Sequence, residues 1–299
     1  MPSPLVSIII PNYNRADIVV ETLRSVAAQT YVNWECIIVD DGSTDDSENV
    51  IGNYVRSDVR FQFYKRPGEI TAGANSCRNL GFERSKGEFV NWLDSDDIIA
   101  PNKIESQINL LSSQKADVAT CKWGRFMHLT EDVSLKELGT FTNFPTGTSL
   151  ITAYGTYGTF FPSHAFLVSR KLADISGLWN KNLQVNQDGE FFCRILINAN
   201  KVVCALDTYV LYRLPHHTNT NQIKTKEKAK HLVLSWILID TYLEVLGTGK
   251  FDRYIETGKA YCFQRLQKDY MDVISEYKFF FRKEIANASL LSRIKRKLF

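Results

Sequence analysis

The sequence predicts an α/β fold with a doubly wound, mostly parallel sheet and a C-terminal helical appendage. Two continuous runs rich in β-branched residues, 6–10 and 34–40, are typical of parallel strands that helices cover on both faces. Apolar residues recur at helical spacing between them, over 18–27, as expected for a crossover helix. From residue 225 onward, apolar stripes at helical spacing predict the appendage.

The remaining elements continue this alternation along the chain. Pro11 ends the first apolar run, and Gly42 supplies a residue that tolerates positive φ in the turn after the second. The further elements predicted are a strand over 61–64, a helix over 72–85, a strand over 89–93, a helix over 103–112 and a strand over 118–123 that residues 126–129 extend. Residues 135–161 lack a clear period and are interpreted as loops or irregular strands that line a cleft.

Composition narrows the class of protein. A net charge of +3 and a pI near 8.4 are too mild for a dedicated nucleic-acid binder. The six cysteines are scattered singly without a C-x-x-C pair, which predicts buried free thiols in a reducing compartment. No signal peptide is evident, and Asp240 and Glu244 interrupt the best candidate for a membrane span. We therefore expect a cytoplasmic protein.

Three carboxylates follow the predicted strand 89–93 directly. Like charges this close repel one another and are costly to bury, so a cation or a hydrogen-bonded polyol would explain Asp94, Asp96 and Asp97. Oxygen ligands in a D-x-D loop suit Mg²⁺ or Mn²⁺, which take their other ligands from water and substrate phosphates. The alternative is that Asp96 or Asp97 caps the helix that begins near Pro101.

Polar loops follow the first, second and fourth strands, and ligands in open α/β sheets bind at the carboxyl ends of strands. Neither a G-x-G-x-x-G motif after the first strand nor a G-x-x-x-x-G-K-[ST] motif is present to hold phosphates. A metal ion on the acids would have to hold them instead.

These motifs, in order, resemble those of the family 2 glycosyltransferases, which have the GT-A fold. The matching segments cover about the first third of the chain and are 7–14, 29–30, 38–45, 78–81, 86–89 and 93–97. The resemblance implies that Asp41 accepts the uracil N3–H, that Tyr13 lies near the base and that Asn14 orders its loop. It also places Pro11 and Ser95 in the nucleotide-sugar site.

The same resemblance implies roles around the diphosphate. Arg78 would face the diphosphate, Asp94 would contact the ribose or the donor sugar, and Asp96 would bind the metal ion. An exposed helix arginine and a simple Asp-Gly turn are the structural alternatives for Arg78 and Asp41. Asp40 is assigned to the turn.

Segments 178–183 and 186–195 resemble a second signature of the family, in which an aromatic turn precedes an acidic pair that opens a helix. Gln187 stands where the family has a glutamate, and Asn180 replaces an acid. The position of Asp188 implies the catalytic base that inversion at the anomeric carbon requires. The alternative for Asp188 is a helix N-cap. His217 is a candidate metal ligand in the loop after the last strand.

We therefore expect a metal-dependent inverting glycosyltransferase that uses a UDP-sugar. The acceptor is expected to be a glycan on a lipid carrier in bacterial surface polysaccharide assembly. Residues 1–100 would bind the nucleotide sugar, 101–215 the acceptor, and 216–299 would form the helical region. A noncatalytic nucleotide-sugar-binding scaffold and a sugar nucleotidyltransferase are the alternatives. Aromatic and basic residues in 279–299 predict peripheral contact with the inner face of the membrane.

Overall fold

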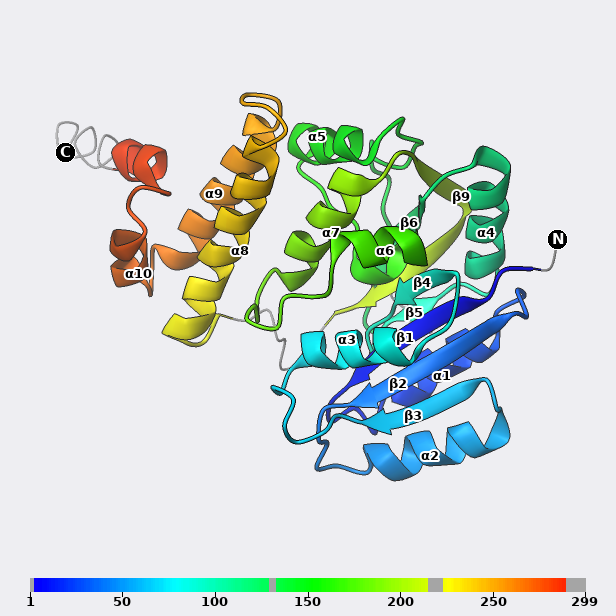
Figure 1. The fold of residues 1–299 in the computed structure, drawn as a ribbon. Coiled ribbons are helices and arrows are strands. Elements are labelled where there is room, and N and C mark those ends of the chain that lie inside the picture. Colours follow the sequence, from blue (N-terminus) through cyan, green and yellow to red (C-terminus); the bar gives the residue numbers. More distant parts are fainter. Residues whose placement is uncertain (1–2, 129–132, 215–222, 289–299) are drawn as a thin grey trace.

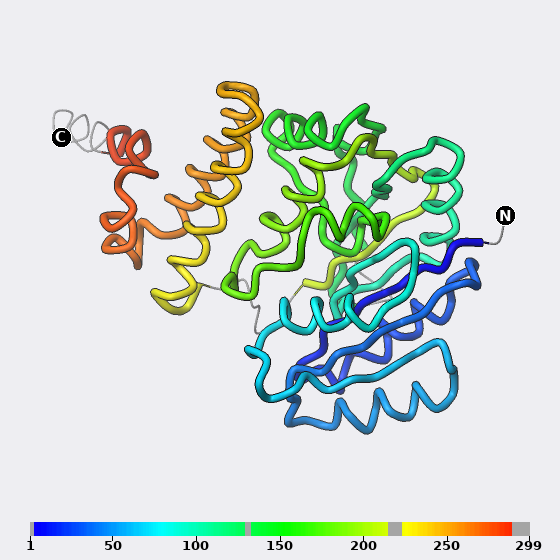
Figure 2. Tube along the Cα trace, viewed as in Figure 1, coloured from blue at the N-terminus to red at the C-terminus, as the bar shows by residue number. Residues whose placement is uncertain are grey.

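The computed structural model describes residues 3–128, 133–214 and 223–288 (Figures 1 and 2). Its strands form one mixed sheet in the order β3-β2-β1-β4-β8-β6-β9-β5, and β7 pairs with β6. The strands are β1 (Val6–Asn12), β2 (Trp34–Asp40), β3 (Phe61–Lys65), β4 (Phe89–Trp92), β5 (Ile98–Ile99), β6 (Val118–Phe126), β7 (Ser134–Leu135), β8 (Leu167–Ser169) and β9 (Val202–Arg213).

Helices cover the sheet and extend beyond it. They are α1 (Val19–Ala27), α2 (Ser47–Ser57), α3 (Ala74–Arg84), α4 (Lys103–Gln114), α5 (Gly147–Tyr157), a 3₁₀ turn η1 (Ser163–Ala165), α6 (Arg170–Ser176), α7 (Gln187–Asn198), α8 (Lys226–Glu244), α9 (Asp252–Leu266) and α10 (Met271–Glu276). Helix α3 packs on β1 and β2, and α4 packs on β6 and β9. Helices α8 and α9 pack on α7 and α5, away from β3 (Figure 1).

The predicted alternation of strands and helices in the first hundred residues is confirmed. Strands β3, β2, β1 and β4 are parallel, and the register places Asn12 opposite Asp40. The short strand β8 runs antiparallel to both β4 and β6, while β6 and β9 are parallel. Strand β9 therefore runs in the same direction as β4, and the carboxyl ends of β1, β2, β4 and β9 share one edge of the sheet.

Strand β1 continues through Pro11 to Asn12, so the prediction that Pro11 ends this strand is wrong. The N–H of Leu93 donates to the carbonyl of Ile9, so the backbone N–H and C=O of Ile9 face β4. Alternate residues of a strand direct these groups to the same side, so those of Pro11 also face β4. Pairing between β1 and β4 stops at Ile9. The absence of an N–H at Pro11 therefore costs the sheet no hydrogen bond.

The prediction of loops or irregular strands over 135–161 is wrong, because α5 lies within this stretch. Thr146 caps the helix by accepting a hydrogen bond from Ser149 N, and Gly158 ends it with φ +61°. Glycine and threonine within the helix weaken its intrinsic propensity. Packing requires the glycines, since a Cβ at Gly147 would meet the carbonyl of Leu196, and one at Gly155 would meet the backbone of α9.

Strand β5 follows the acidic loop, so α4 begins only at Lys103, and Asn102 occupies its N-cap position. The alternative that Asp96 or Asp97 caps this helix is therefore wrong. All six cysteines are free and buried, as predicted. Among the residues that the structure describes, no helix is long and apolar enough to cross a membrane.

One aromatic residue of 279–299, the segment predicted to contact a membrane, packs inside the protein instead. Phe281 is fully buried and packs edge-on against Phe263 of α9. Phe279 is 85% exposed. The remaining part of that segment, 289–299, lies outside the described residues.

A cluster of buried polar side chains holds η1 and the residue after it by hydrogen bonds to their carbonyls. Asn91 Nδ2 donates to the carbonyls of His164 and Phe166, and Gln107 Nε2 donates to that of Ala165. Lys103 Nζ contributes one long hydrogen bond, 3.5 Å, to the carbonyl of Phe166. The Lys103 side chain is fully buried, and this burial lowers its pKa to about 7.

Replacing Lys103 with methionine should stabilise the protein. The unfolded chain binds a proton at Lys103 up to about pH 10, whereas the folded chain releases it near pH 7, so wild-type stability rises with pH across this window. Lys103→Met removes the buried amine, and we expect a gain of about 1–3 kcal/mol at pH 6 that shrinks by pH 9.5. Calorimetric melting at both pH values measures it, and an equal or lower Tm at pH 6 would contradict the assignment.

Candidate active site

The loops after β1 and β2 are tied together by Asp40. Its Oδ2 accepts hydrogen bonds from Gly42 N at 3.0 Å and Ser43 N at 2.8 Å, and its Oδ1 accepts one from Asn12 Nδ2 at 2.9 Å. Asn14 has φ +50°, and its Oδ1 accepts a hydrogen bond from Thr44 N at 2.8 Å. Asp40 therefore stabilises the turn after β2, as predicted, and Asn14 links the loops after β1 and β2.

Asp41 projects from the same turn into a polar surrounding. Its Oδ1 is paired with Arg66 Nε and accepts a hydrogen bond from Gly73 N at 3.1 Å. The side chains of Asp41 and Arg66 are only 14% and 12% exposed. Tyr13 is 53% exposed, while Pro11 is buried within β1. The turn after β2 therefore presents one shielded carboxylate, and the loop after β1 presents an open aromatic ring.

Asp94, the first acid after β4, is held by Arg78 of α3. Arg78 Nη2 lies 2.7 Å from Asp94 Oδ1, and Nη1 donates to Asn75 Oδ1 at 2.9 Å. The guanidinium also lies over the ring of Trp179, 4.4 Å from its centroid. Arg78 is thus a buried residue at the site, 4% exposed, and the alternative of an exposed helix arginine is wrong.

Asp97 is the anchor of the acidic loop. Its Oδ1 accepts a hydrogen bond from Arg213 N at 2.8 Å, and its Oδ2 lies 3.0 Å from Nδ1 of His164. Both side chains are almost fully buried. Asp97 therefore faces the protein interior, while Ser95, also buried, lies between the two remaining acids.

Asp96 is the least compensated of the three acids. Its nearest charged partner is Arg15, whose Nε lies 3.5 Å from Asp96 Oδ2. Burial, and then the charges of Asp97 and Asp94, raise the pKa of Asp96 to about 7. About a third of its side chain remains exposed. A carboxylate that its surroundings disfavour in the charged form, yet open to solvent, fits a divalent cation that lowers this cost.

The donor set also limits what kind of metal site this would be. Among the described residues, no three His, Cys, Asp or Glu side chains converge into a ready ligand cluster. A cation at Asp96 would therefore take most of its ligands from water or from a substrate, as Mg²⁺ and Mn²⁺ commonly do. His217, the other candidate ligand, lies outside the described residues.

Asp188 lies in the first turn of α7. Asn186, with φ +54°, occupies the N-cap position, so the alternative that Asp188 is the cap is wrong. Burial raises the pKa of Asp188, the charge of Asp94 adds to the rise, and Arg78 opposes it. Helix α7 is linked to Arg78 through Trp179, whose ring stacks on Phe191 of α7 with 4.1 Å between centroids and lies under the Arg78 guanidinium.

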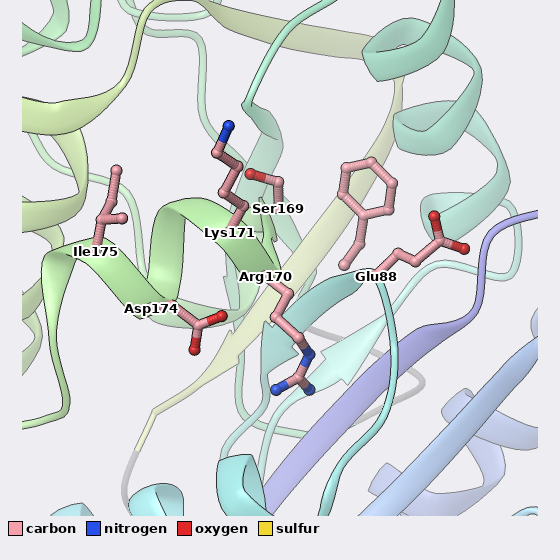
Figure 3. A pocket seen from close by; sticks show the side chains of 7 residues that line it. Glu88, Ser169, Arg170, Lys171, Asp174 and Ile175 are labelled. Atoms are coloured by element: carbon pink, nitrogen blue, oxygen red, sulfur yellow. The ribbon is translucent and has the colours of Figure 1, made fainter.

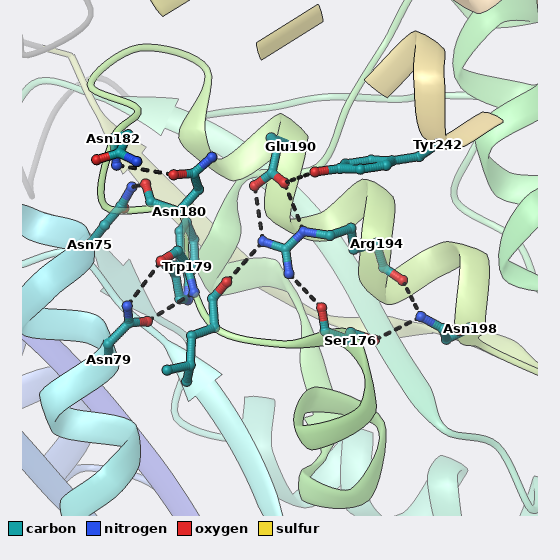
Figure 4. Close-up of polar contacts among 11 residues, drawn as sticks. Asn75, Asn79, Ser176, Trp179, Asn180, Asn182, Glu190, Arg194, Asn198 and Tyr242 are labelled. Carbon is teal, nitrogen blue, oxygen red and sulfur yellow. Dashed lines mark hydrogen bonds and ion pairs between the residues drawn. The ribbon is translucent and has the colours of Figure 1, made fainter. Parts of the chain in front are cut away.

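The segment before α7 is fixed by a network of hydrogen bonds (Figure 4). Asn79 of α3 pairs in both directions with the backbone of Trp179, at 2.9 Å each. Glu190 accepts two hydrogen bonds from Arg194 and one from Tyr242 of α8 at 3.0 Å. The network connects α3, α7 and α8 and holds Trp179 against Arg78.

Sequence reasoning missed Arg66, His164 and Arg213 as partners of the acids. Arg213 stands next to the predicted histidine loop, which was the one available signal. The other two lie in stretches without a motif.

A hollow at the opposite edge of the sheet, between the start of β4 and α6, is separate from this site (Figure 3). It is lined by Glu88, Phe89, Ser169, Arg170, Lys171, Asp174 and Ile175. None of these residues belongs to the acidic loop or to α7.

Several known proteins are similar to parts of this chain. An uncharacterized glycosyltransferase of Rickettsia typhi is 48% identical over 110 residues, which are 37% of this chain and 33% of that protein. TuaG of Bacillus subtilis, a putative teichuronic acid biosynthesis glycosyltransferase, is 40% identical over 108 residues, which are 36% of this chain and 42% of TuaG. The chain thus spans about a third to two fifths of the length of these curated relatives.

Solved structures resemble the fold over most of the chain. S. aureus TarS 1-349 in complex with UDP-GlcNAc has a TM-score of 0.66 at 17% identity, covering 92% of this chain and 78% of that one. The mannosyltransferase PcManGT from Pyrobaculum calidifontis, in complex with GDP-Man and Mn²⁺, has a TM-score of 0.59 at 14% identity, covering 99% and 81%. At these identities the likeness concerns the fold, which is of the GT-A type with a helical C-terminal region.

The family is decided by a match to the sequence model described as Glycosyl transferase family 2. Residues 7–175 match it, from β1 through α6, and include the acidic loop and the turn that carries Asp41. Because this match covers more than half of the chain, the protein belongs to glycosyl transferase family 2.

Proposed function

We propose that the protein is an inverting glycosyltransferase that moves a sugar from a UDP-sugar to a glycan acceptor. The observation that carries the proposal is that Arg78 pairs with Asp94 and covers the ring of Trp179, which stacks on Phe191 of α7, the helix that carries Asp188. The pair formed by Arg78 and Asp94 of the acidic loop is thus linked by packing to the helix that carries Asp188, a carboxylate whose pKa burial raises. This arrangement provides a donor side and a base side within one site.

The donor nucleotide would bind along the carboxyl ends of β1 and β2. Asp41 is proposed to accept the uracil N3–H, with Tyr13 against the base and Pro11 and Asn14 shaping the loop. The shielding of Asp41 strengthens a hydrogen bond to a ligand there, because water competes less. TarS has been seen with UDP and with UDP-GlcNAc, which supports a uridine nucleotide.

Asp96 is proposed to hold Mg²⁺ or Mn²⁺, and His217 stays a candidate for a second ligand. A bound divalent cation would neutralise charge on the diphosphate as it leaves. Arg78, buried and already paired with Asp94, would add a fixed positive charge facing the diphosphate. Asp94 and Ser95 are proposed to contact the ribose or the sugar. The neighbour PcManGT has been seen with Mn²⁺.

Asp188 is proposed to accept the proton of the acceptor hydroxyl as the hydroxyl attacks the anomeric carbon. A base works best when its pKa lies near the operating pH, and burial moves the pKa of Asp188 in that direction. The positive charge of Arg78 acts against this rise in pKa.

The acceptor is proposed to be a lipid-linked glycan of a bacterial surface polysaccharide. The similarity to TuaG and to TarS supports this class. Peripheral contact with the inner membrane face would bring the enzyme to such an acceptor, and the basic residues of 289–299 would provide attraction to anionic lipid.

Asp96→Asn should abolish the effect of Mn²⁺ on UDP binding. It should also stabilise the free protein at pH 8. Wild-type Asp96 binds its proton more tightly in the folded than in the unfolded chain, so the stability of wild type falls as the pH rises from about 4 to 7. Allowing for solvent at the exposed third of the side chain, we expect a gain of about 1 kcal/mol, or roughly 2–4 °C in Tm.

Titration calorimetry with UDP, with and without Mn²⁺, and melting at pH 5 and pH 8 measure both effects. Asp174→Asn, an exposed acid at the opposite edge of the sheet, is the matched control. Metal-dependent UDP binding that persists in Asp96→Asn would exclude this carboxylate as the ligand.

Asp188→Asn should slow sugar transfer by about 10²–10⁴-fold while UDP affinity stays unchanged, because the amide keeps the shape and loses the base. Transfer is measured with the donor that wild type hydrolyses best among a panel of UDP-sugars with Mn²⁺. Near wild-type transfer by Asp188→Asn would refute the base, and no turnover of any UDP-sugar by wild type would refute the proposed function.

Deleting 289–299 should weaken binding to anionic vesicles and leave donor hydrolysis intact, since the deletion removes none of the candidate site residues. The electrostatic part of vesicle binding should fall as salt rises, because the Debye length is about 8 Å at physiological ionic strength. Co-sedimentation with anionic and neutral vesicles measures it. Equal sedimentation with both kinds of vesicle would speak against a membrane role for this segment.

A further inference from the structure

Arg213, the last residue of β9, joins segments that are far apart in the sequence. Its Nε donates to the carbonyl of Asp96 at 2.7 Å, and its Nη1 donates to that of Met127 at 3.3 Å. Its Nη2 pairs with Oε2 of Glu21 in α1 at 2.5 Å. The guanidinium lies over the ring of Phe126, 4.3 Å from the centroid, and the side chain is 8% exposed.

The backbone of Arg213 also holds the acidic loop. Its N–H donates to Asp97 Oδ1 at 2.8 Å, opposite the contact between Asp97 Oδ2 and His164. One residue therefore fixes the loop at two points, the carbonyl of Asp96 and the carboxylate of Asp97. Because Asp97, His164 and the side chain of Arg213 are buried or nearly so, water does not easily replace their contacts.

The charge of Arg213 is directed away from the carboxylate of Asp96. The guanidinium meets Asp96 through the main-chain carbonyl, and its counter-charge is Glu21. If Glu21 lost its charge, the guanidinium would be free to turn toward the neighbouring carboxylates and neutralise them. The pair thus leaves the Asp96 carboxylate available to a cation.

We infer that Arg213, held by Glu21, is a positioning residue that sets the acidic loop for the donor and its metal ion. The inference rests on the proposed binding of UDP and a divalent cation at this loop. Arg213 does not touch the reacting atoms, so it acts through Asp96 and Asp97. Partners that orient a ligating group typically contribute 10–100-fold to metal affinity.

Arg213→Lys tests the inference in the full chain. Lysine keeps the charge but has a single ammonium group in place of a planar fork, so it does not reach the two carbonyls and Glu21 together. We expect Mn²⁺ and UDP affinities, measured by calorimetry, to fall about 10–100-fold. Amide hydrogen exchange should accelerate over residues 93–97 and remain unchanged in the strands of the sheet.

Glu21→Gln is the second variant, and it leaves Arg213 in place. It replaces a charge-assisted hydrogen bond with a neutral one, so we expect a smaller loss of Mn²⁺ affinity, about 3–10-fold. Should Arg213→Lys fail to fold, this variant decides the question.

Arg170→Lys is a matched control at the opposite edge of the sheet (Figure 3). Arg170 makes similar contacts, with Nε donating to the carbonyl of Gly87 at 2.6 Å and the guanidinium 4.5 Å from the ring centroid of Phe82. We expect this variant to bind Mn²⁺ and UDP like wild type.

Wild-type affinities and loop exchange in both Arg213→Lys and Glu21→Gln would overturn the inference, as would an equal loss of affinity in Arg170→Lys. If wild type binds UDP equally in EDTA and in Mn²⁺, the proposed metal role fails. The inference is then decided by UDP affinity in EDTA and by exchange over 93–97, because Asp94 and Ser95 belong to the same loop.

Discussion

Mutual repulsion among the three carboxylates that follow β4 is the constraint on which the rest of the site depends. Two of them have partners from elsewhere in the chain: Asp94 pairs with Arg78 of α3, and Asp97 accepts a hydrogen bond from the backbone of Arg213 and lies against His164 of η1. Asp96 alone keeps an unfavourable charge, which appears as its raised pKa. The second half of the sheet is therefore needed at the site, since η1 precedes β8 and Arg213 ends β9.

The parts that the sequence predicted are those with a local signal. Strands β1, β2 and β4 are continuous apolar runs, and the acidic loop follows β4 directly, so their order and shared edge follow from pattern alone. Helix α5 was missed because its glycines are required by close packing against α7 and α9, which no window of sequence shows. Arg66 and His164 were missed because they are far in sequence from the acids they contact. Arg66 is 25 residues from Asp41, and His164 is 67 residues from Asp97.

The helical region is joined to the site through α7. Tyr242 of α8 donates to Glu190, and Asn186, just before α7, donates to Ser235 of α8 at 3.0 Å. On the other side, Asn79 of α3 holds the backbone of Trp179. The helix that carries Asp188 is thus fixed from two sides, and the αL conformation of Asn186 sets where its first turn begins.

Burial of the six thiols has a practical consequence for studying this protein. Burial raises the pKa of each thiol in the interior, including Cys36, Cys77 and Cys121, so little thiolate forms near neutral pH and reagents have poor access. A single cysteine introduced on an exposed surface would therefore outcompete the native ones for a maleimide dye. Fluorescent or spin probes can be attached at chosen sites of the chain without first removing any native cysteine.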